Sequence, residues 1–214
     1  MIGGMIMELK IKDPGSALTH FIAMLTAMVA ATPLLIKAAS VPGTMHLKAL
    51  SVFIVSMILL YAASTVYHTF DISEHVNKIL RKIDHMMIFI LIAGTYTPVC
   101  LIVLGNKSGY RMLSLVWGIA IVGIIINALW INCPKWFSSV IYIAMGWVCI
   151  MAIRQIVAAL TPAAFAWLLA GGIIYTIGGV IYALKLPIFN SKHKNFGSTR
   201  SSISSSWAEA SAIT

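Results

Sequence analysis

Six long apolar segments constrain this chain more than any other feature of its sequence. They cover residues 17–39, 47–70, 84–104, 110–131, 136–153 and 162–184. Each is close to the roughly 20 residues that a helix needs to cross the hydrocarbon core of a bilayer. Hydrophobic residues make up 60% of the chain and charged residues 10%, with a mean hydropathy of +0.94, values that exclude a water-soluble globule of this size. We therefore predict an all-α fold, a polytopic transmembrane helix bundle.

The distribution of basic residues predicts the topology. Fifteen Lys and Arg residues against six Asp and Glu give a net charge of +9, but they lie between and beyond the apolar segments. They therefore indicate orientation, and we expect no nucleic-acid partner. A cytoplasmic N-terminus places ten of the bases inside and five outside, and the difference depends on the tail and on the cluster from Lys78 to Lys82. We expect a multi-pass protein of the plasma (inner) membrane, with residues 1–16 in the cytoplasm, a helix bundle over residues 17–184, and a polar, disordered tail over residues 185–214.

Ionisable side chains at the end of the second segment and the start of the third are the candidate functional residues. Ser64 and His68 are four residues apart, which puts them on one face of a helix. The polar loop of residues 71–82 returns the chain to the same membrane surface, so we expect Asp84 to lie beside His68. Ionisable residues within a membrane usually mark a function. A bond between helices is an equally good explanation of Ser64.

The remaining histidines and the cysteines give weaker signals. We expect His20, in the first turn of its helix, and His75, in the loop, to be solvated. His85 points about 100° away from Asp84 around the helix and is not expected to be a ligand. The three cysteines form no C-x-x-C pair, so they indicate neither a disulfide framework nor a cysteine metal site.

Three local features of the helices are also predicted. Ser16 is a candidate N-cap of the first helix. Pro98 interrupts the backbone ladder of the third, where Thr95 or Thr97 can bond the freed carbonyl. Asn127 is expected to form a hydrogen bond to a neighbouring helix.

Three separated motifs carry a resemblance to a known family. They are Ala63–Phe70, Lys82–His85 and Gly94–Pro98. In this order they closely resemble the haemolysin III branch of the membrane family that includes the progestin and adiponectin receptors, over residues 17–198. The resemblance implies seven transmembrane helices and a zinc ion near the cytoplasmic side.

The resemblance also implies roles for individual residues. In the family, one histidine of the second helix and two of the seventh, spaced H-x-x-x-H, hold the zinc. An aspartate of the third helix orients the water on the metal, and a serine of the second lies beside it. These positions correspond here to His68 as the metal ligand, and to Asp84 and Ser64 as the catalytic residues.

By this resemblance, the chain is expected to be a zinc-dependent intramembrane hydrolase acting on an amide or ester of a membrane lipid. Two alternatives stay open: a non-catalytic protein, receptor-like or engaged in membrane homeostasis, and a lytic or pore-forming haemolysin. The uniformly apolar segments argue against a pore, which needs a polar lining.

The chain departs from the family pattern after Ser198. Residues 199–214 are rich in serine, where the H-x-x-x-H of the seventh helix is expected. They can be back-translated so that a shift of one base reads His-Glu-Ile-Phe-His followed by an apolar run. We therefore interpret this chain as frameshifted and without the seventh helix. It is expected to be inactive, to bind zinc weakly, and to be less stable than a complete member or to form a homo-oligomer. The alternative is a natural disordered tail.

Overall fold

The computed structural model describes residues 11–130 and 135–184. The predicted polar tail and the frameshift lie outside these residues. The helical elements are α1 (Pro14–Ala39), α2 (Met45–Thr69), α3 (Glu74–Pro98), the π-helix η1 (Val99–Leu104), α4 (Lys107–Leu129), α5 (Lys135–Gly146), the 3₁₀-helix η2 (Trp147–Ala152), α6 (Ile153–Ala159) and α7 (Pro162–Leu184). They form six helical stretches that are long and apolar enough to cross a membrane. The described residues contain no strand, so the predicted all-α helix bundle is confirmed.

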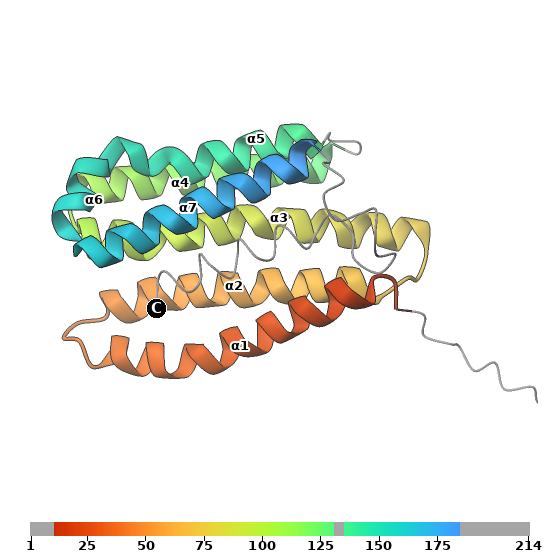
Figure 1. Cartoon of the computed structure of the whole chain (residues 1–214), viewed down its shortest axis with the longest axis horizontal. Coiled ribbons are helices and arrows are strands. Elements are labelled where there is room, and N and C mark those ends of the chain that lie inside the picture. The colour runs from red at the N-terminus through yellow and green to blue at the C-terminus, as the bar shows by residue number, and fades with distance from the viewer. Residues whose placement is uncertain (1–10, 131–134, 185–214) are drawn as a thin grey trace, which may run out of the picture.

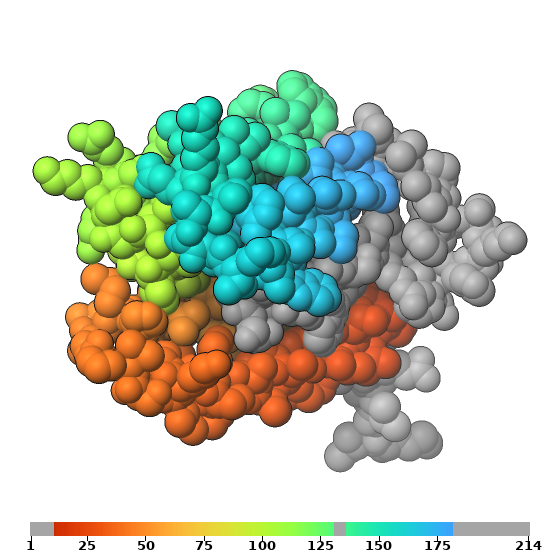
Figure 2. All heavy atoms as spheres, turned by 60° about the vertical axis from the view of Figure 1, so that its left-hand side comes forward, coloured from red at the N-terminus to blue at the C-terminus, as the bar shows by residue number. Residues whose placement is uncertain are grey.

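The helices pack in two groups that share α3. In the first group, α1 packs on α2 and α2 on α3, around a core that includes Phe53, Ile54 and Tyr61. In the second group, α4, α5, η2 and α6 enclose a core around Phe89 and Val116, and α7 packs on α5. Figure 1 shows α3 between these groups, and the space-filling view shows α1 and α2 as one layer beneath the later helices (Figure 2). Residues from both halves of the chain therefore meet along α3.

The first helix starts at Pro14, two residues before the predicted cap. Proline suits the first helical position, because its fixed φ matches the helix and its missing N–H has no partner there. Asp13 is the N-cap, but its side chain makes no capping hydrogen bond. Ser16 lies buried inside the first turn, so the prediction that it caps the helix is wrong.

The third helix begins ten residues earlier than predicted. Most of the stretch expected to be a loop, residues 71–82, belongs to α3, which starts at Glu74. Ser73 caps it by accepting a hydrogen bond from the Val76 amide at 3.3 Å, and Glu74 pairs with Lys78 at 2.6 Å on the first turns. Such a cap and an i,i+4 pair stabilise a helix that extends beyond the apolar segment. Asp84 therefore lies almost three turns inside α3.

Pro98 ends the regular part of α3, and the chain continues as the π-helix η1. Proline cannot donate a hydrogen bond to the carbonyl of Gly94, four residues earlier. Thr95 bonds the Leu91 carbonyl at 2.9 Å and Thr97 bonds that of Ala93 at 2.9 Å. The prediction that one of these threonines bonds the freed carbonyl is therefore wrong, because each reaches the carbonyl four residues before its own position.

Asn127 joins α4 to α5, as predicted. Its amide oxygen accepts a hydrogen bond from the Ser138 hydroxyl at 3.2 Å, and its amide nitrogen donates one to the Gly123 carbonyl at 3.0 Å. Both Asn127 and Ser138 are buried. The polar side chain is thus paired on both sides inside an apolar interface.

The fifth span is not one regular helix, because a tyrosine of α3 interrupts it. The Tyr96 hydroxyl donates a hydrogen bond to the Gly146 carbonyl at 2.7 Å and accepts one from the Cys149 amide at 2.9 Å. In a continuous α-helix the Gly146 carbonyl would accept from the Ile150 amide and the Cys149 amide would donate to the Met145 carbonyl, so the hydroxyl takes the place of one ladder partner of each group. Insertion of a polar group into the ladder is a known cause of irregular helices. The chain passes from α5 into the 3₁₀-helix η2 at this point.

Substitution of Gly94 by alanine is expected to destabilise the bundle by about 1–3 kcal/mol, the usual effect of overpacking. A methyl group at this position would collide with the side chain of Ser56, where α3 crosses α2. Thermal unfolding in detergent measures the effect. Gly118→Ala is the matched control, because nothing lies within 4 Å of a methyl group at that helical position. Equal unfolding temperatures for the two variants would contradict the close contact between α2 and α3.

Candidate metal centre

The packing of α2 against α3 brings the three predicted site residues together. Ser64 and His68 lie one turn apart on α2, and Asp84 faces them from α3. All three are buried, with exposed fractions of 2%, 3% and 8%. The Ser64 hydroxyl and the His68 ring both lie close enough to the Asp84 carboxyl to interact with it. The structure thus places an imidazole, a hydroxyl and a carboxyl at one end of the bundle.

One nitrogen of His68 is bonded and the other has no partner. Nδ1 lies 2.9 Å from the Asp13 carboxylate, which comes from the residue before α1. Nε2 is buried and has no hydrogen-bond partner among the described residues. A buried polar atom without a partner is costly and is uncommon in folded proteins. This nitrogen is the atom of the site that a ligand would satisfy.

His20 lies against the site, contrary to the prediction that it is solvated. Its exposed fraction is 6%, because α1 packs its first turns against the end of α2. The ring stacks on that of His68, with centroids 5.5 Å apart and planes 3° from parallel. Neither of its ring nitrogens has a partner in the described part of the chain. Its position in the first turn predicted exposure to solvent. The packing of α1 on α2, which buries the ring, cannot be read from the sequence near His20.

The other histidines near the site do not join it. His85 is half-buried, and its backbone carbonyl accepts a hydrogen bond from Tyr142 at 2.9 Å. His75 is exposed, as expected, although it lies in α3 and not in a loop. Within residues 11–130 and 135–184, no group of three His, Cys, Asp or Glu side chains is arranged to hold a metal ion. The described residues therefore offer His68 alone of the three imidazoles that the resemblance implies.

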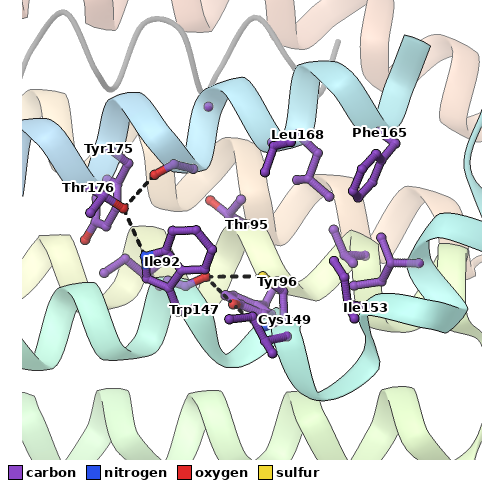
Figure 3. Close-up of a pocket in the computed structure, with 17 residues that line it drawn as sticks. Ile92, Thr95, Tyr96, Trp147, Cys149, Ile153, Phe165, Leu168, Tyr175 and Thr176 are labelled. Carbon is purple, nitrogen blue, oxygen red and sulfur yellow. Dashed lines mark hydrogen bonds between the residues drawn. The ribbon is translucent and has the colours of Figure 1, made fainter. Parts of the chain in front are cut away.

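A separate apolar cavity lies farther along α3. It has a volume of about 110 Å³ and lies between α3, the η2–α6 region and α7. Figure 3 shows Ile92, Phe165 and Leu168 facing it, with the hydroxyl groups of Tyr96 and Thr176 among its few polar atoms. Ile92 follows Asp84 by eight residues, so the near end of the cavity is roughly 12 Å from the site along the helix. The cavity therefore lies next to the cluster of Ser64, His68 and Asp84, none of which lines it.

Comparisons with known proteins identify the family of the chain. The profile of the haemolysin-III related family matches residues 9–198. The chain is 36% identical over 167 residues to a hemolysin-3 homolog of Bacillus subtilis (strain 168), an alignment that covers 78% of each protein. It is 38% identical over 167 residues to hemolysin-3 of Bacillus cereus, covering 78% of this chain and 76% of that protein. The chain therefore belongs to the haemolysin III family.

Proposed function

We propose that the cluster of Ser64, His68 and Asp84 is part of a zinc site in a membrane hydrolase that cleaves an amide or ester bond of a lipid. The observation that carries this proposal is the buried, unpaired Nε2 of His68, with Asp84 and Ser64 close by. An imidazole nitrogen, a carboxylate and a hydroxyl in an apolar setting are suited to hydrolysis assisted by a metal.

The residues fit zinc in part. His68 presents one imidazole nitrogen, a ligand type that zinc prefers, and a carboxylate bonded to the other nitrogen is a frequent companion of metal-binding histidines. Catalytic zinc sites take three protein ligands. We propose that the other two imidazoles belong to the shifted reading of residues 199–214, so that the chain as it stands binds zinc weakly and is inactive.

The chain's own residues suggest how the reaction would proceed. Bound zinc would supply Lewis acidity and a water nucleophile near neutral pH. Asp84 would accept a proton from a water nucleophile and would hold that water in position. The Ser64 hydroxyl would fix the orientation of the Asp84 carboxyl. The apolar cavity beside Ile92 would take part of a lipid tail, which supports a lipid as the substrate.

Lipid turnover in liposomes tests the proposal. The frame-restored protein is expected to hydrolyse a ceramide or ester lipid, and a chelator should abolish the activity. Asp84→Asn should lower the rate by about 100-fold or more, the usual contribution of a general base. Asp71→Asn is the matched control, because Asp71 lies at the same end of the bundle and, among the described residues, its side chain accepts a hydrogen bond only from Asn77, at 2.6 Å.

The same experiment separates the alternative functions. Release of a trapped dye without lipid turnover would refute the hydrolase and favour the lytic function that the name of the Bacillus cereus relative suggests. Neither turnover nor dye release would refute both and favour a receptor-like or structural role. We propose a location in the plasma membrane with a cytoplasmic N-terminus, which would place the site near the cytoplasmic surface.

A further inference from the structure

We propose that Asp13 is a positioning residue that holds His68 in one tautomer and so presents its Nε2 to the metal. This inference rests on the proposed zinc site and adds to it a residue from outside the transmembrane motifs. The carboxylate of Asp13 lies 2.9 Å from Nδ1 of His68, 55 residues away in the sequence. A carboxylate accepts hydrogen bonds and cannot donate them, so Nδ1 must carry the proton. Neutral His68 then has its lone pair on Nε2.

The backbone fixes Asp13 in this position. Its amide donates a hydrogen bond to the His68 carbonyl at 2.9 Å, and the Lys12 amide donates one to the Thr69 carbonyl at 3.3 Å. The Lys12 ammonium group also lies 3.9 Å from the centre of the Tyr67 ring, a cation–π contact. Residues 12 and 13 are thus bound to the last turn of α2, and the Asp13 carbonyl accepts a hydrogen bond from the Ala17 amide at 2.9 Å, so the carboxylate is held beside the ring from both helices.

Among the described residues, the side chain of Asp13 makes no other hydrogen bond. It occupies the N-cap position of α1, where an aspartate usually bonds the backbone amides of the first turn, yet it makes no such bond. Its side chain is 43% exposed, whereas that of His68 is 4% exposed. The carboxylate therefore gives up a capping interaction and bonds a buried imidazole. Stacking of His20 on the His68 ring limits rotation of that ring, so both its tautomer and its orientation are set.

The test reads the tautomer directly in the chain as it exists. The full chain is labelled with ¹⁵N-histidine in detergent micelles and studied near pH 8.5, well above the ordinary histidine pKa of about 6.5. His68→Gln identifies the signal of His68. We expect Nδ1 of His68 to be protonated and Nε2 unprotonated. Asp13→Asn should produce a mixture of tautomers, Asp13→Glu should restore the single one, and Asp71→Asn should leave it unchanged.

Two results would overturn the proposal: a proton on Nε2 in the native chain, or an unchanged tautomer in both Asp13→Asn and Asp13→Ala. A merely structural contribution of Asp13 would alter the unfolding temperature and leave the tautomer as it was. In the frame-restored chain, Asp13→Asn should also weaken zinc binding 10–100-fold, the usual effect of losing such a partner. The frame-restored chain could bind no zinc while its His68 tautomer still depended on Asp13. That result would refute the zinc site and would still establish that Asp13 sets the tautomer of His68.

Discussion

Replacement of Tyr96 by phenylalanine is expected to lower the free energy of unfolding by about 2 kcal/mol. The Tyr96 hydroxyl satisfies the Gly146 carbonyl and the Cys149 amide at once. Phenylalanine keeps the ring but removes the hydroxyl from both backbone groups, and the Cys149 thiol, 3.5 Å from the Gly146 carbonyl, is only a weak donor. The surroundings are mostly apolar, so each group bears the cost of an unsatisfied polar atom in a membrane protein. Movement of η2 that brings the two groups together would reduce this loss.

Thermal or denaturant-induced unfolding in mild detergent measures the effect. Tyr110→Phe is the matched control, since Tyr110 is 49% exposed and its hydroxyl forms no hydrogen bond in the described part of the chain. It should change the free energy of unfolding by less than about 0.5 kcal/mol, as surface substitutions usually do. Equal stabilities of the two variants would mean that the Tyr96 hydroxyl does not determine the irregular course of the fifth span.

The sequence predicted the helical fold well because the signal for a membrane span is its length. Each of the six apolar segments became part of a helix, and the all-α bundle followed from their number and composition. The residues at the end of α2 and in α3 were also predictable as neighbours, since the polar stretch between the two spans returns the chain to the same membrane surface. The helical period was enough to predict that Ser64 and His68 share a face, and the reversal of the chain was enough to predict that Asp84 lies near them.

The wrong predictions concern residues whose position depends on contacts with distant residues, or residues of a helical segment that is polar. The first turns of α3 are rich in charged residues, and such a polar stretch predicts a loop. In the structure they form a helix that Ser73 caps. His20 was expected in solvent because its burial depends on how α1 packs on α2. Asp13 gave no signal at all, since its partner His68 is 55 residues away. Nothing in the local pattern indicates that an aspartate at an N-cap position bonds a histidine of another helix.

A change of reading frame after Ser198 is expected to convert a weak zinc binder into a tight one. Restoration of the shifted frame would supply two histidines spaced H-x-x-x-H, followed by an apolar run. The match to the haemolysin-III related family ends at residue 198, the position at which the frame is proposed to change. Structural zinc sites with four ligands bind with about 10–16 kcal/mol, or roughly 3 kcal/mol for each ligand. Two further imidazoles should therefore strengthen binding by roughly four orders of magnitude.

Metal analysis of the two purified proteins measures this difference. The frame-restored chain should retain about one zinc ion per molecule after dialysis against a weak chelator, and the present chain far less. Within the frame-restored chain, His68→Ala should remove the zinc, whereas His75→Ala should not, because His75 is exposed and lies outside the cluster. Full zinc content in both proteins would show that residues 199–214 supply no ligand.

The DNA around the codon of Ser198 decides whether the shifted frame exists. Codon degeneracy allows the shifted reading of residues 199–214 but does not require it, so the zinc experiment alone tests the ligands and not their origin. Codons compatible with the shift, together with zinc binding that returns only in the restored frame, would explain why His68 has a bonded Nδ1 and an unpaired Nε2. Codons incompatible with the shift would make the serine-rich segment the true continuation of the chain. The unpaired nitrogen would then have to find its partner elsewhere, and His20, stacked on the same ring with both nitrogens unpaired in the described part of the chain, would be the first residue to test.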